Sequence, residues 1–217
     1  MSARALVRIN AVASFLAASV LAQDYRRLRI TNRCPAAPIW IAHEAKADIG
    51  PGEQNVMIGP GQSHDFRTPD GLSATRYWPK MGCDATGGSC TLGGSGGPGE
   101  ACVVRGPGGD DYSRCAPPVD TKFEASFGRQ GGFCNQAHQD GCDFIDVSLV
   151  DGWTLPFKLE MRGPWCSRAS TTIDCSGLTF DQCPVAEQFT AAGIVGDLRA
   201  INPKTNGVAG CYSPCSK

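Results

Sequence analysis

The chain has 217 residues, with 20 basic and 21 acidic side chains that give a formal net charge of −1. This balance excludes the strongly basic surface on which nucleic-acid binding depends. A hydrophobic content of 41% is enough for a core, and the length suits one large domain or one domain with a small lobe.

The first residues predict a signal peptide for export. Arg4 and Arg8 give a positively charged start, residues 11–20 are apolar, and Val20 to Ala22 form a small-residue cleavage site before Gln23. A membrane anchor is the alternative, but the apolar stretch is far shorter than the ~20 residues that a spanning helix needs. We expect a secreted, extracellular protein with a signal peptide over residues 1–22 and no transmembrane segment. Without the two arginines, 18 basic residues face 21 acidic ones, a net charge of −3.

Strands are predicted for the rest of the chain, because 27 glycines and 15 prolines leave little room for helices. Residues 28–31 and 39–41 are rich in β-branched and aromatic side chains and flank a turn at Cys34-Pro35. This pattern predicts a first β-hairpin.

Residues 93–99, between Cys90 and Cys102, match one catalytic motif and one cofactor-binding motif, but only formally. Gly93 to Gly97 fits a nucleophile elbow, and Gly94 to Gly99 fits a dinucleotide fingerprint. Both motifs need a strand before them and a helix after them, and neither is indicated here. We interpret the segment as a flexible loop held at its ends.

Residues 122–127 alternate between polar and apolar side chains. Phe123, Ala125 and Phe127 fall on one face of a strand and Glu124 on the other. Glu124 is therefore expected to project from the outer face of a sheet.

Two further strands are indicated at residues 144–150 and 155–161, around a turn at Asp151-Gly152. Several short strands between turns favour an all-β fold, a flattened β-sandwich or barrel, over an α/β fold. From about Trp165 onward, loops join cysteines, with one weak helical candidate at Val185 to Thr190. We expect a small disulfide-rich lobe there.

All 12 cysteines follow the proposed cleavage site, and their even number favours disulfides in an oxidising compartment. Cys211 and Cys215 are spaced like zinc ligands, but no second close pair faces them, and the three histidines are scattered. We therefore expect no metal and no other cofactor.

Six motifs occur in order along the mature chain: ITNRC (30–34), PIW (38–40), RYWPKMGC (76–83), DVSLVDGWTLP (146–156), DQCP (181–184) and GCYSPC (210–215). Together they resemble the thaumatin-like proteins, the pathogenesis-related group 5 type. The resemblance implies a thaumatin-like β-sandwich over residues 23–165, a partial disulfide-rich lobe over 166–217, and an acidic cleft between them. Long members of the family continue beyond the position of Cys215, so we expect a C-terminally short form.

The resemblance also implies a set of cleft residues. The family's arginine corresponds to Arg76, its glutamate to Glu124, and two of its aspartates to Asp146 and Asp151. A last family aspartate belongs to a C-terminal segment that this chain lacks.

Family members resemble antifungal defence proteins, and some bind or slowly hydrolyse β-1,3-glucans. Hydrolysis needs one protonated and one ionised carboxyl group, about 5–5.5 Å apart for retention or roughly 6.5–9.5 Å for inversion. Glu124 is the natural acid. In a regular strand Asp146 and Asp151 are roughly 16 Å apart and on opposite faces, so we pair Glu124 with Asp146 across strands. The expected sugar-stacking residues are Tyr77, Phe133 and Trp153.

Sequence proximity predicts three disulfides, Cys83–Cys90, Cys102–Cys115 and Cys134–Cys142. The family pattern implies Cys183–Cys211, and Cys166–Cys175 is a weaker expectation.

The resulting hypothesis is a secreted monomer that binds β-glucan polysaccharide, with at most weak endo-β-1,3-glucanase or antifungal activity. The alternative is a non-enzymatic defence or interaction protein that perturbs membranes, inhibits a foreign enzyme or acts as a secreted effector.

Overall fold

The computed structural model describes residues 25–46, 48–129, 133–135, 141–163, 171–190 and 193–217. The expected signal peptide lies outside them. In the described residues the fold is all-β, as predicted, with one short 3-10 helix, η1 (Phe180–Gln182). The strands are β1 (Leu28–Thr31), β2 (Ile39–Ala45), β3 (Val56–Ile58), β4 (Ser63–Phe66), β5 (Thr75–Lys80), β6 (Lys122–Ser126), β7 (Phe144–Ser148), β8 (Gly152–Trp153), β9 (Phe157–Glu160), β10 (Thr172–Cys175), β11 (Glu187–Gln188), β12 (Val195–Gly196), β13 (Arg199–Ile201) and β14 (Val208–Tyr212).

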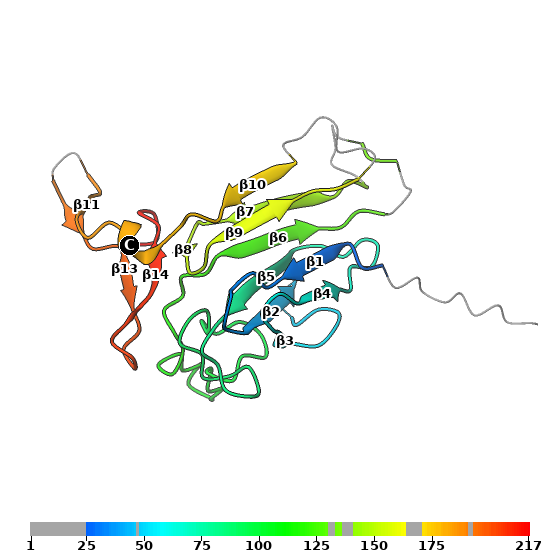
Figure 1. Cartoon of the computed structure of the whole chain (residues 1–217). Helices are drawn as coiled ribbons and strands as arrows, with labels where there is room; N and C mark the ends of the chain where they lie inside the picture. The colour runs from blue at the N-terminus through cyan, green and yellow to red at the C-terminus, as the bar shows by residue number, and fades with distance from the viewer. Residues whose placement is uncertain (1–24, 47, 130–132, 136–140, 164–170, 191–192) are drawn as a thin grey trace, which may run out of the picture.

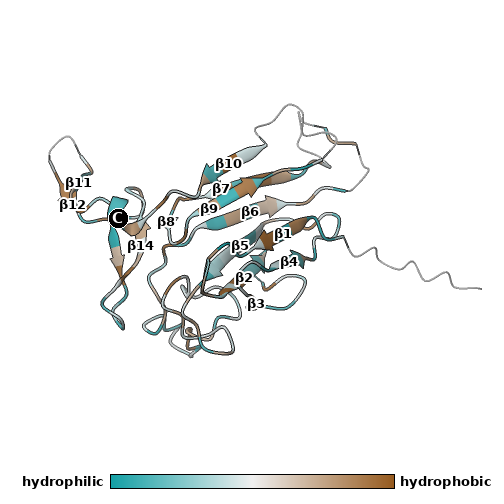
Figure 2. Cartoon of the chain, viewed as in Figure 1, coloured by the Kyte–Doolittle hydropathy of each residue, from teal (hydrophilic) through white to brown (hydrophobic). Residues whose placement is uncertain are grey.

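A five-stranded antiparallel sheet in the order β3-β2-β5-β6-β7 forms the centre of the fold (Figure 1). The β1–β4 ribbon packs on one of its faces, and Figure 2 shows β1 in the brown of hydrophobic residues. Between the two layers lies the main hydrophobic core. Each of these seven strands except β7 contributes to it, and Phe127 just after β6 completes it: Leu28, Ile39, Ile41, Ile58, Phe66, Tyr77, Ala125 and Phe127.

The predicted first hairpin is wrong, although both of its strands are present. β1 pairs with β4, whereas β2 pairs with β3 and β5. The physical reason is the buried side chain of Asn32, which donates from Nδ2 to the carbonyls of Ala37 and Ile58. These bonds lead the chain from one layer into the other instead of closing a tight turn.

The predicted strands at residues 144–150 and 155–161 form, but they do not pair with each other. β7 ends at Ser148 and pairs with β6, and β9 pairs with β10. Between them Gly152 has a φ of +126°, and a Cβ there would lie 2.0 Å from the carbonyl oxygen of Cys211. Only glycine fits this turn, which brings β8 against β14.

The weak helical candidate at residues 185–190 is also wrong. Glu187 and Gln188 form β11, which pairs with β12 in a small hairpin. A Cβ on Gly196 would lie 2.3 Å from the Phe189 ring, so the aromatic ring packs directly on this glycine. This local contact favours the hairpin.

The glycine-rich loop is packed, which corrects the expectation of a flexible linker. Trp78 is 3% exposed and donates its indole N–H to the carbonyl of Gly93 at 3.0 Å. A Cβ on Gly97 would lie 2.5 Å from the Trp78 ring. The glycines therefore allow the backbone to approach a buried tryptophan, and residues 90–102 contain neither a strand nor a helix that an elbow or dinucleotide motif needs.

Within the described residues four disulfides are present, Cys83–Cys90, Cys102–Cys115, Cys134–Cys142 and Cys183–Cys211. The expected Cys166–Cys175 bond is not formed, since Cys175 is a free thiol at the end of β10. There the β9–β10 ladder holds it opposite Phe157, and Cys166 lies outside the described residues. Among the residues that the structure covers, no helix is long and apolar enough to cross a membrane.

Candidate functional site

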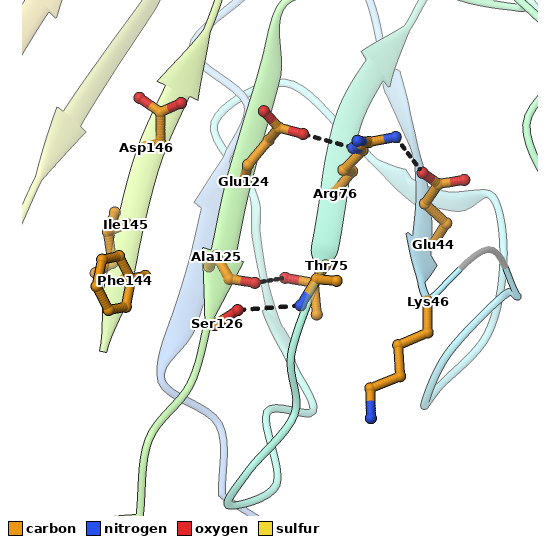
Figure 3. A pocket seen from close by; sticks show the side chains of 11 residues that line it. Glu44, Lys46, Thr75, Arg76, Glu124, Ala125, Ser126, Phe144, Ile145 and Asp146 are labelled. Atoms are coloured by element: carbon orange, nitrogen blue, oxygen red, sulfur yellow. Dashed lines mark hydrogen bonds and ion pairs between the residues drawn. The ribbon is translucent and has the colours of Figure 1, made fainter. Parts of the chain in front are cut away.

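Four charged side chains form one row across the outer face of the five-stranded sheet (Figure 3). Glu44 on β2 lies opposite Arg76 on β5. Arg76 lies opposite Glu124 on β6, which in turn lies opposite Asp146 on β7. Residues paired across a sheet share a face, so these side chains project together. We call them the charged row; at about 4.8 Å between strands it spans roughly 14 Å.

Arg76 connects the row through two ion pairs. Its Nε donates to Glu124 Oε1 at 2.5 Å, and one terminal nitrogen donates to Glu44 Oε1 at 2.9 Å. The pKa of Arg76 is raised above its usual value, chiefly by the hydrogen bond to Glu124. The guanidinium is thus a permanent cation between two carboxylates, and 52% of the side chain remains exposed.

The row lies in a groove with a volume of about 500 Å³. Within the described residues the side chain of Asp146 forms no ion pair or hydrogen bond, and β7, on which it lies, is an edge strand of the sheet. Lys46 lies at one end of the groove (Figure 3). Phe144, which is 42% exposed, lies on β7 two residues before Asp146 and also lines the groove. The arrangement offers acceptors, a fixed donor and a small apolar surface side by side.

The face of the sheet that carries the charged row is covered by another segment of the chain only a few residues away from the row. Trp78 follows Arg76 at the next position on this face, and Trp40 stands on β2 on the same side as Glu44. Both tryptophans are buried, at 3% and 7% exposure, under the cysteine-rich segment of residues 81–120, where Gly87 and Gly97 contact their rings. The charged row therefore begins where this cover ends.

Tyr77 does not belong to the site. It is 2% exposed in the core, where its ring stacks on His43 and meets Phe66 edge-on. Burial raises the pKa of Tyr77 to about 12. As the neighbour of Arg76 in a strand it must point to the opposite face, so its expected role in sugar stacking is wrong.

Asp151 lies beside the row but does not line the groove. The turn after β7 carries it back toward β6, where it forms an ion pair with Lys122. Lys122 is two residues before Glu124 and shares its face. The irregular turn that the sequence indicated at Asp151-Gly152 thus brings Asp151 near the row through a lysine.

The two other expected stacking residues lie apart from the groove. Phe133 is 87% exposed. Trp153 on β8 stacks on Phe180 at 5.3 Å and lines a second hollow of about 300 Å³ with Tyr212 and Glu187. Neither residue lines the groove of the charged row.

Sequence reasoning missed Glu44. It follows the apolar run of β2, and nothing in the sequence reports that β2 pairs with β5 in the register that sets it opposite Arg76. The only local signal is alternation, which puts Glu44 on the same face as Trp40 and Ala42.

Comparison with known proteins places the chain in a family. The thaumatin family model matches residues 32–217. The chain is 30% identical over 182 residues to Thaumatin-like protein 1 of Arabidopsis thaliana, a match that covers 81% of the chain and 63% of that protein. It is 29% identical over 208 residues to Pathogenesis-related protein 5 of Arabidopsis thaliana, covering 92% of the chain and 67% of that protein.

A third relative is the Alpha-amylase/trypsin inhibitor of Zea mays, 29% identical over 171 residues, or 72% of the chain and 70% of that protein. This all-β, disulfide-linked chain belongs to the thaumatin family. It spans 63% of the length of Thaumatin-like protein 1.

Proposed function

We propose that this thaumatin-family protein is secreted and binds β-1,3-glucan-type polysaccharide along the charged row. The observation that supports this most directly is the in-register line of Glu44, Arg76, Glu124 and Asp146 in an open groove. Carboxylates accept hydrogen bonds and a guanidinium donates them, and sugar hydroxyls do both. The choice of glucan, and a role in defence, come from the family resemblance.

An apolar surface beside the row supports the same proposal. Phe144 lies on β7 in register with Ser126, on the same face as Glu124, and is 42% exposed. We propose that Phe144 takes the sugar-stacking role for which Tyr77, Phe133 and Trp153 were expected. An aromatic face buries the apolar face of a sugar ring at little entropic cost.

A binding assay on insoluble β-1,3-glucan tests the proposal. The full chain is mixed with curdlan, and the bound fraction is measured against glucan concentration for wild type, Glu124→Gln and Asp146→Asn. A lost hydrogen bond to a charged group is worth about 1.5–3 kcal/mol, so each variant should bind about 10- to 150-fold more weakly. Glu53→Gln, at an exposed site away from the groove, should bind like wild type. Unchanged isotherms for both row variants would place the ligand elsewhere.

Glu44 is part of the proposed site because its carboxylate accepts a hydrogen bond from a terminal nitrogen of the Arg76 guanidinium. Glu44→Gln should weaken binding less than Arg76→Ala, since the amide oxygen still accepts from Arg76 while the charge is lost. Glu44→Ala should bind more weakly than Glu44→Gln. Equal binding by wild type and Glu44→Ala would restrict the site to Arg76, Glu124 and Asp146.

We propose binding as the main activity and hydrolysis as weak at most. Glu124 must carry a proton to act as the acid, yet its carboxylate already accepts the Nε–H of Arg76. Wild type should therefore release little reducing sugar from laminarin above a Glu124→Gln control. Strong release by wild type that this control abolishes would overturn this part of the proposal.

Inhibition of a foreign enzyme is the second candidate function, because one relative is named Alpha-amylase/trypsin inhibitor. It predicts no saturable glucan binding and a dose-dependent loss of α-amylase or trypsin activity. The row variants should then inhibit as well as wild type does.

A further inference from the structure

Asp120 is a buried carboxyl group that no part of the proposed function uses. It lies two residues before β6 and is 2% exposed. Its Oδ2 forms a hydrogen bond with the hydroxyl of Ser95, in the middle of the glycine-rich loop. Its Oδ1 is buried and, within the described part of the chain, has no hydrogen-bond partner.

Two lysines near Asp120 are each engaged by another carboxylate. Lys80 donates to Glu100 at 2.7 Å and 2.9 Å inside the protein. On the other side Lys122 pairs with Asp151. The charged groups around Asp120 are therefore two ion pairs, each neutral as a whole. Neither lysine forms an ion pair with Asp120 in the described part of the chain.

An ionised carboxylate is poorly accommodated at this position. Transfer of an unpaired charge into the interior is very unfavourable, and one neutral hydroxyl offsets only a part of that cost. A neutral carboxylic acid keeps this hydrogen bond without the charge, because its carbonyl oxygen still accepts from the Ser95 hydroxyl. Burial accordingly raises the pKa of Asp120 to about 7. The hydrogen bond from Ser95 and the charge of Lys122 oppose this rise in part, and Asp151 and Glu100 add small contributions to it.

The Asp120–Ser95 hydrogen bond joins the glycine-rich loop to the start of strand β6. Ser95 belongs to the loop that covers Trp78, and the neighbouring Gly94 accepts from the backbone N–H of Ala116 at 2.8 Å. Asp120 leads into β6, which carries Glu124 of the charged row. The bond therefore fastens the cysteine-rich cover to the strand that starts beside it.

We propose that Asp120 and Ser95 form a pH-sensitive latch: it is closed while the buried Asp120 is neutral, and ionisation of Asp120 favours its opening because the charged group is better accommodated in water. The latch holds the glycine-rich loop on the start of β6. It does not depend on what the charged row binds.

The sign of the pH effect follows from the raised pKa. In the unfolded chain Asp120 ionises near 3.8, whereas in the folded protein it stays protonated up to about 7. Its stabilising contribution is complete below about pH 4 and is lost as the pH rises toward 7. Within this window the group alone raises the unfolding equilibrium constant about tenfold for each pH unit.

Urea unfolding of wild type and Asp120→Asn between pH 4.5 and 6.5 tests the latch. Asparagine keeps the shape and the neutral hydrogen bond but cannot ionise. The ratio of the wild-type unfolding constant to that of Asp120→Asn should therefore rise about 100-fold over these two pH units. Asp48→Asn, which changes an exposed aspartate, should follow the wild-type profile. Parallel profiles for wild type and Asp120→Asn would overturn the proposal.

A direct titration covers the case in which Asp120→Asn does not fold. The side-chain carboxyl ¹³C signal of Asp120 in the wild-type protein, assigned through the amide of Thr121, should titrate close to neutral pH. A midpoint below pH 5 would show that the buried group is ionised across the acidic range and that no latch exists.

Discussion

Lys80 and Glu100 form an ion pair whose surroundings differ sharply from those of the surface pairs. Their side chains are 0% and 2% exposed, and the Lys80 ammonium also donates to Asn55 and to the carbonyl of Gly87, both at 2.6 Å. Burial lowers the pKa of Lys80 and raises that of Glu100, while their mutual attraction opposes both shifts. A buried pair of this kind is costly to break, because one unpaired charge or several unsatisfied acceptors remain inside.

Lys80→Met should destabilise the protein by about 3–5 kcal/mol, since it leaves the buried Glu100 carboxylate without its cation. The free energy of unfolding, from urea titrations at one pH, measures this loss. Arg29→Met is the matched control, because Arg29 forms an ion pair with Asp65 at the surface, where water replaces the partner. Similar losses for both variants would mean that burial does not set the strength of the Lys80–Glu100 pair.

At the scale of single elements, the alternation of polar and apolar residues predicted correctly which face of a strand each side chain occupies. Local sequence patterns did not predict correctly which strands pair with each other. The alternation over residues 122–127 placed Glu124 outside and Ala125 and Phe127 inside, as found. Strand pairing depends on contacts that are distant in sequence, such as those of Asn32 with Ile58, and no local pattern carries them. For the same reason Glu44 was missed, and Tyr77 was assigned to the site although its position beside Arg76 puts it on the core face.

Gly97→Ala tests whether the glycine-rich loop is a packed element. The added methyl group would meet the Trp78 ring at 2.5 Å, and overpacking of this kind costs about 1–3 kcal/mol. Gly108→Ala is the matched control, since a Cβ there meets nothing within 4 Å. Urea unfolding should show a loss for Gly97→Ala and none for Gly108→Ala; equal stability would support the flexible loop that the composition first suggested.

For the whole molecule, the described residues contain two separate hydrophobic clusters. The larger one lies between the β1–β4 ribbon and the five-stranded sheet. The smaller one contains Leu198 and the Cys183–Cys211 disulfide, with Trp153, Phe189 and Tyr212 packed against it. Figure 1 shows β11, β13 and β14 to one side of the sheet. The order of motifs predicted the family and, through it, the Cys183–Cys211 disulfide, and sequence proximity predicted three more. Only the register of β2, β5, β6 and β7 reveals the complete charged row.

Removal of the Cys183–Cys211 disulfide should loosen the smaller cluster and leave the charged row intact. The cysteines are 28 residues apart, and closing a loop of that size is worth about 3.5 kcal/mol in the chain-entropy model. A double Cys183→Ser, Cys211→Ser variant should therefore show faster amide hydrogen exchange in β13 and β14, because local opening becomes easier there. Exchange in β5 and β6 should not change, since their packing belongs to the larger cluster and their ladder is independent of the disulfide. If the charged row binds curdlan, the variant should bind it as wild type does. A parallel increase of exchange in β5 and β6 would instead show that the two clusters unfold as one cooperative unit.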